Sequence, residues 1–119
     1  MHLAAAIAVG AVALAHIYFL ILEMFLWDKP KGLATFGLTQ AFATASKSLA
    51  MNQGLYNGFL AAGLIWGISL GAAGKGVEIF FLSCVIVAGI FGGFTASRKI
   101  LAVQALPGAI ALVLVWLAN

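Results

Sequence analysis

Two ionisable side chains, His16 and Glu23, lie inside the first long apolar stretch of this sequence. An ionisable group within a membrane-spanning helix costs roughly 2.5 kcal/mol or more on insertion scales, and it usually marks a functional site that faces the bundle interior. The two side chains are nearly two helical turns apart, so both point the same way, about 10 Å from each other along the axis. A ligand, a proton or a water chain could occupy that gap.

Four polar side chains from later segments are the expected partners of this pair: Gln53, Tyr56, Asn57 and Gln104. Antiparallel helices bring the ends that carry these residues to the same depth as Glu23, whichever way the chain is oriented. Pro107 adds to this polar layer, because it has no N–H and leaves a backbone carbonyl of the preceding turn without its helical donor. The six side chains together form the predicted ligand-binding cleft.

Composition defines the elements that must position this cleft. Of 119 residues, 65% are hydrophobic and 8% are charged, a balance that predicts an integral membrane protein rather than a soluble domain. Apolar runs long enough to cross a hydrocarbon core of about 30 Å as helices cover residues 3–26, 54–72, 77–96 and 100–117. Because these runs are apolar on every side, strands are not expected. The predicted fold is an all-α membrane protein, with four transmembrane helices in a single antiparallel domain over residues 1–119.

Charges predict the orientation of these spans and exclude some partners. Five of the six basic residues, Lys29, Lys31, Lys47, Arg98 and Lys99, fall in two loops on one side, and Lys75 lies on the other. The positive-inside rule therefore places both termini outside the cytoplasmic membrane. The basic residues are too dispersed for a nucleic-acid surface. A lone Cys84 and two histidines give no expectation of a metal or other cofactor, and the start of the chain does not resemble a cleavable signal peptide.

The segment between the first two spans is too long for a plain connection. Leu38, Phe42, Ala45 and Leu49 follow the helical period along one face, which predicts an interfacial helix over residues 34–50 with its apolar side towards the membrane lipids. Stripes of small residues, Gly63, Gly67 and Gly71 in the second span and Gly89 and Gly93 in the third, predict close helix packing. That packing is either within one chain or between copies in a homo-oligomer.

Several strings of this sequence resemble a known family. They are residues 52–64, Asn-Gln-Gly-Leu-Tyr-Asn-Gly-Phe-Leu-Ala-Ala-Gly-Leu, together with residues 16–18 and 23–27, residues 84–90 and the Gln104 to Pro107 turn. The chain resembles the bacterial domain-of-unknown-function family thirteen-oh-four over nearly its whole length. The resemblance implies a small four-span protein of the bacterial inner membrane, and it implies no catalytic residue.

Three hypotheses about function follow from these residues. The first is binding or transport of a small amphipathic or cationic molecule against Glu23, with protonation of Glu23 or His16 coupled to release. The second is a membrane-embedded enzyme, such as a proton-transferring isomerase of a lipid-like substrate, with His16 and Glu23 as its catalytic acid and base. The third is an accessory subunit whose polar layer only holds helices together. We rank the first highest, because one acid in an amide-rich cleft requires less geometry than two-residue catalysis.

Overall fold

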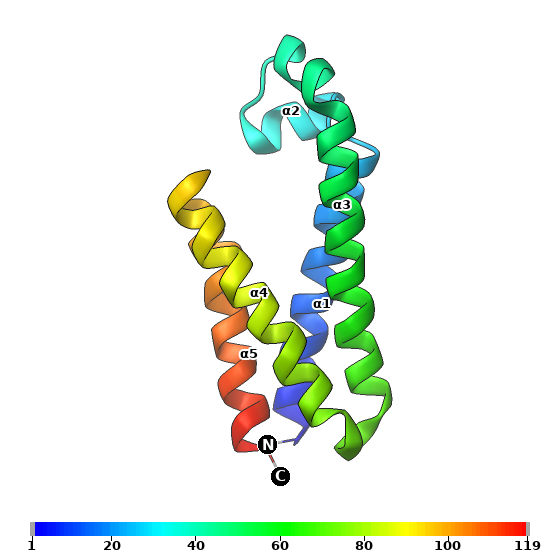
Figure 1. Cartoon of the computed structure of the whole chain (residues 1–119), viewed down its shortest axis with the longest axis vertical. Coiled ribbons are helices and arrows are strands. Elements are labelled where there is room, and N and C mark those ends of the chain that lie inside the picture. Colours follow the sequence, from blue (N-terminus) through cyan, green and yellow to red (C-terminus); the bar gives the residue numbers. More distant parts are fainter. Residues whose placement is uncertain (1, 119) are drawn as a thin grey trace. The chain divides into compact units, whose positions relative to one another are not determined.

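Helices account for all regular structure in the part of the chain that the computed structural model describes, residues 2–118 (Figure 1). The elements are α1 (His2–Met24), α2 (Pro30–Phe36), α3 (Gln40–Ser69), the 3-10 turn η1 (Gly71–Gly74), α4 (Lys75–Thr95), the π-helical turn η2 (Leu101–Ala105) and α5 (Leu106–Leu117). No strand occurs among the described residues. The all-helical class predicted from the sequence is confirmed.

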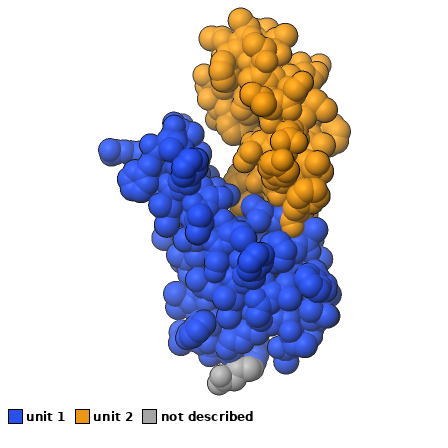
Figure 2. Space-filling view, viewed as in Figure 1, with its two compact units in different colours: residues 1–14, 60–119 blue, residues 15–59 orange. Residues whose placement is uncertain are grey.

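Contacts divide the chain into two compact units (Figure 2). Unit 1 comprises residues 1–14 and 60–119, and unit 2 comprises residues 15–59. Side chains from four helices form the core of unit 1. They are Val9 of α1, Leu64 of α3, Leu82 and Val85 of α4, and Val115 of α5.

Glycines set the close packing inside unit 1. A Cβ atom on Gly89 would lie 2.6 Å from the backbone nitrogen of Ala105, and one on Gly93 would lie 2.4 Å from the side chain of Leu101. α4 therefore approaches η2 and α5 more closely than any larger residue would allow, as small-residue stripes do in membrane helices. Gly63 packs against Phe81 in the same way. These glycines pack within the chain, whereas Gly71 of the predicted stripe does not, because a Cβ atom there would meet nothing within 4 Å.

Pro107 changes the helix that contains it. Leu101–Ala105 forms a π-helical turn, in which the backbone N–H of Leu106 donates to the carbonyl of Leu101. A π turn of this kind commonly accompanies an interruption of the ordinary hydrogen-bond ladder, and Pro107 removes one donor from that ladder. The predicted span over residues 100–117 is thus a helix in two parts, η2 followed by α5.

The loop helix differs from the prediction over residues 34–50. α2 ends at Phe36 because Gly37 adopts the left-handed conformation, with φ of 65°. α3 begins at Gln40, where the Thr39 hydroxyl accepts a hydrogen bond from the backbone N–H of Phe42 at 3.2 Å, a standard N-cap. With no breaker after that point, α3 runs unbroken into the predicted second span.

Between residues 2 and 118, two helical stretches are long and apolar enough to cross a membrane: His2–Met24 and Gly71–Thr95. They correspond to the predicted first and third spans. Leu101–Leu117 is a shorter apolar helix. α3 does not meet the same criterion, because polar residues such as Asn52, Gln53 and Asn57 lower its hydropathy. These helices therefore provide two candidate spans, and they do not establish a bundle of four spans.

Candidate functional site

Glu23 and Asn57 meet in unit 2 across two helices. The side-chain nitrogen Nδ2 of Asn57, on α3, donates a short hydrogen bond to Oε1 of Glu23, on α1. Asn57 is 7% exposed, and Glu23 is partly buried. A carboxylate that accepts a hydrogen bond from an amide is held in one orientation. The two residues, which the sequence predicts to lie in the same layer, are in direct contact.

Glycines on α3 allow this contact. A Cβ atom on Gly54 would lie 2.6 Å from Cγ of Met24 and 3.1 Å from Cβ of Glu23, and one on Gly58 would lie 2.7 Å from Cδ1 of Leu20. The face of α3 that carries Asn57 therefore presses directly on the last turns of α1. At this distance the short side chain of an asparagine reaches the carboxylate without an intervening water.

His16 occupies a different environment on α1. Its side chain is 1% exposed and packs edge-on against Phe19, with ring centroids 5.2 Å apart and ring planes at 69°. Aromatic pairs in this arrangement contribute about 0.5–1.5 kcal/mol beyond the burial of their area. The imidazole is thus part of the apolar packing of unit 2, two turns before Glu23.

Three other predicted site residues lie on α3 and in η2. Gln53 and Tyr56 are exposed on α3, Tyr56 at 49%, and Tyr56 lies near Phe59 with ring centroids 6.1 Å apart. Gln104 is partly buried in the π turn η2 of unit 1. Of the predicted set, the structure brings together Glu23 and Asn57.

Two polar interactions join the loop after α1 to the first turns of α3, and the sequence did not predict them. Nε1 of Trp27 donates to Oγ of Ser46 at 3.0 Å, and Nζ of Lys47 lies 3.2 Å from Oδ2 of Asp28. The indole of Trp27 also packs on Phe36, with ring centroids 5.0 Å apart. In the sequence, Lys47 counts as one of the basic loop residues that predict topology, and the partner of a loop charge cannot be read from local spacing.

The hydrogen bond from Lys47 holds the pKa of Asp28 below its ordinary value of 3.8. Because the native pKa is lower than the unfolded one, the pair stabilises unit 2 fully above pH 3.8 and loses its effect as the pH falls through the native pKa. We expect the thermal stability of the parent protein to fall more steeply below pH 4 than that of Asp28→Asn. Melting curves between pH 3 and 6 measure this difference, and identical slopes would mean that the ion pair does not form in solution.

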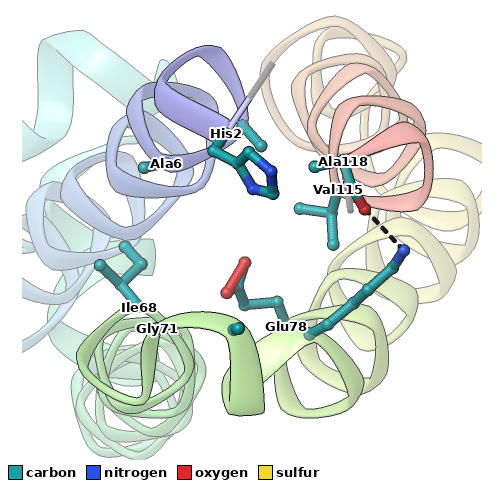
Figure 3. A pocket seen from close by; sticks show the side chains of 10 residues that line it. His2, Ala6, Ile68, Gly71, Glu78, Val115 and Ala118 are labelled. Carbon is teal, nitrogen blue, oxygen red and sulfur yellow. Dashed lines mark hydrogen bonds between the residues drawn. The ribbon is translucent and has the colours of Figure 1, made fainter.

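Unit 1 contains a pocket of about 280 Å³ that the sequence analysis did not anticipate (Figure 3). Its polar lining consists of His2, Lys75 and Glu78, set among small and apolar side chains. Nζ of Lys75 donates to the carbonyl oxygens of Ala118, at 2.7 Å, and Trp116, at 3.1 Å. The sequence feature that could have indicated this pocket is Lys75 and Glu78, two charged residues three positions apart at the start of the third predicted span. Among the described residues, no three His, Cys, Asp or Glu side chains gather as a metal site.

Comparison with known proteins gives two matches. The model of the family described as "Protein of unknown function (DUF1304)" matches residues 10–116. The chain is also similar to "Uncharacterized protein YpaA" of Lactococcus lactis subsp. lactis (strain IL1403). The two are 30% identical over 95 residues, which cover 78% of this chain and 80% of that protein. No solved structure matches the chain significantly.

Proposed function

Since the chain belongs to the DUF1304 family, as its strings at residues 16–27 and 52–64 indicate, we propose its function from its own side chains. It is a four-span protein of the bacterial inner membrane that binds a small amphipathic or cationic molecule at Glu23. The observation that carries this proposal is the hydrogen bond from Asn57 to Glu23. It holds a carboxylate in a defined orientation between two largely apolar helices.

Exposed apolar side chains support the membrane setting. Large hydrophobic residues lie exposed on every long helix, for example Leu14 at 67% on α1, Leu49 at 76% on α3, Phe94 at 82% on α4 and Trp116 at 66% on α5. Lipid chains would cover exposed side chains of this size on each of the long helices. The two candidate spans and the shorter Leu101–Leu117 helix support the same proposal, with both termini outside, as the distribution of basic residues predicts.

A cation is the natural partner of Glu23. A carboxylate among apolar helices is costly unless it is paired, and a single amide donor satisfies only one of its lone pairs. A ligand with an ammonium or similar donor would offset the remaining desolvation, and Asn57 would keep the carboxylate aimed at it. His16, Gln53 and Tyr56, which belong to the same unit as Glu23, complete the proposed binding set. Transport would require more than one copy, because one bundle of this size has no room for a pore.

The first experiment is native mass spectrometry of the protein extracted gently from its own membrane, with Glu23→Gln as the test variant. We expect a defined bound mass on the parent protein that is absent from Glu23→Gln, because the amide keeps the shape and removes the charge. Asp28→Asn is the matched control, since it removes an acid outside the spans and should retain the mass. The subunit number is read from the same spectra.

The close packing of Gly54 on α1 favours a second candidate, in which the Glu23 and Asn57 contact only joins the two helices. That candidate predicts an apo species for the parent protein and for both variants. It also predicts that Glu23→Gln is as functional in the cell as the parent. Either result would contradict ligand binding at Glu23.

A further inference from the structure

Apolar and polar side chains from several helices line the pocket of unit 1. α1 contributes Ala5 and Ala6, the end of α3 contributes Ile68, and α5 contributes Val115. Its volume of about 280 Å³ lies just below the range for drug-sized ligands, about 300–1,000 Å³, so it suits a small molecule. Figure 3 shows the side chains of His2 and Glu78 pointing into the same space. The pocket therefore combines apolar walls with a few convergent polar groups, which is the usual character of a ligand site.

The two charged groups of the pocket are not equivalent. The ammonium of Lys75 donates to the carbonyl oxygens of Trp116 and Ala118, where it satisfies the C-terminal end of α5. The carboxylate of Glu78 has no hydrogen bond or ion pair within residues 2–118, and it is partly buried. Glu78 is thus the charged group of the pocket that is still available to a ligand.

Close packing at two glycines next to the pocket restricts the side chain of Glu78. A Cβ atom on Gly67 would lie 2.6 Å from Cγ of Glu78, so the stem of the glutamate lies directly on α3. A Cβ atom on Gly74 would lie 1.8 Å from the carbonyl oxygen of Gly67. The carboxylate consequently projects from a stem with little freedom to turn away, which lowers the entropy lost when it binds a ligand.

We propose that this pocket binds a small amphipathic amine, with its ammonium group on the carboxylate of Glu78 and its alkyl part against Ile68 and Val115. An ammonium provides the N–H donors that a carboxylate accepts in charge-assisted hydrogen bonds. An anionic ligand does not fit, because Glu78 repels it and Lys75 is already committed to two carbonyl groups. The ammonium could belong to a free alkylamine or to the headgroup of a lipid such as phosphatidylethanolamine.

This site is independent of the one proposed at Glu23. Every residue that lines the pocket belongs to unit 1, whereas Glu23 and Asn57 belong to unit 2. Asp28→Asn therefore serves as a control, because Asp28 lies in unit 2 and belongs to neither proposed site. The two proposals can fail separately.

The test is calorimetric titration of hexylamine into the full-length protein in phosphatidylcholine nanodiscs at pH 7, with empty nanodiscs as the blank. We expect saturable binding that is at least about tenfold weaker in Glu78→Gln and about tenfold weaker for hexanol, which lacks the charge. Asp28→Asn, which removes an acid that belongs to neither proposed site, should bind hexylamine like the parent. Equal affinity of Glu78→Gln and the parent, or no saturable binding to the parent, would overturn the proposal.

A second pair of variants tests the apolar wall without touching a charge. Ala6→Leu places extra methyl groups in the pocket and should weaken hexylamine binding about tenfold or more, whereas Ala4→Leu, exposed on the same helix outside the pocket, should leave it unchanged. This pair decides the question if Glu78→Gln does not fold. Equal binding by the two alanine variants would contradict the proposed site.

Nanodiscs that contain phosphatidylethanolamine separate the two sources of the ammonium. If the lipid headgroup occupies the pocket, the apparent affinity for hexylamine falls several-fold in these nanodiscs, and Glu78→Gln abolishes the difference. If a free amine is the ligand, the affinity is the same in both lipids. Both results support the pocket, and they assign its occupant.

Discussion

Replacing Gly74 by alanine should lower the thermal stability of the protein more than any other single methyl group added to unit 1. The new Cβ atom would lie 1.8 Å from the carbonyl oxygen of Gly67 and 2.7 Å from its carbonyl carbon. Both are backbone atoms, so no side-chain rotation relieves the clash, and the end of α3 must move away from η1. Overpacking of this kind costs about 3 kcal/mol, which corresponds to a decrease in Tm of roughly 10 °C.

Gly76→Ala is the matched control for this prediction. Gly76 lies in the first turn of α4, and a Cβ atom there would meet nothing within 4 Å. Alanine is the better helix former by about 0.5–1 kcal/mol, so we expect an unchanged or slightly higher Tm. Melting curves by circular dichroism in a mild detergent compare the two variants. Similar Tm values for Gly74→Ala and Gly76→Ala would mean that η1 does not pack on α3 as described.

Replacing Asn57 by alanine should lower the free energy of unfolding by about 2–3 kcal/mol. The substitution leaves the carboxylate of Glu23 without its donor between two helices, and an unsatisfied buried group costs about 1–3 kcal/mol, or more when it is charged. Glu23→Ala should cost less, because it leaves an unpaired amide rather than an unpaired carboxylate. Asn52→Ala, which removes an exposed amide on the same helix, should change the free energy by less than about 0.5 kcal/mol.

A double-mutant cycle makes this prediction specific to the contact. For Asn57→Ala and Glu23→Ala together, we expect the costs to be non-additive, with a coupling energy of about 1–3 kcal/mol. The free energies come from denaturant titration of the protein in detergent micelles. Additive costs would show that the two side chains do not depend on each other. If Glu23→Ala lowered the free energy of unfolding more than Asn57→Ala does, the unpaired amide would be the costlier group to leave buried.

Helix content followed directly from the sequence, because long apolar runs in a chain with few charges leave no alternative that satisfies the backbone. α1 and α4 match the predicted runs over residues 3–26 and 77–96 within a few residues. The boundary at Gly37 and Thr39 was missed for a local reason. The helical period of Leu38, Phe42, Ala45 and Leu49 suggested one helix across this boundary. A left-handed glycine ends α2 there, and a threonine cap begins α3.

The exposed face of α3 also depends on tertiary structure. Phe42 and Leu49 are 56% and 76% exposed, while the small residues Ala43 and Ala50 are buried. An apolar periodicity shows which residues share a face, but it does not show whether protein or lipid covers that face. The small residues are buried because they allow α3 to approach its neighbours closely.

The sequence by itself determined the all-helical class, the family and the two polar residues, Glu23 and Asn57, that belong to one layer. Only the tertiary structure decided that Asn57 donates to Glu23, because that contact requires the close approach at Gly54 and Gly58. The same holds for the pocket with Glu78, whose walls come from the start of α1, the end of α3 and the end of α5. Periodicity and hydropathy act over neighbouring residues, whereas a cavity depends on how distant segments pack, and no local pattern records that packing.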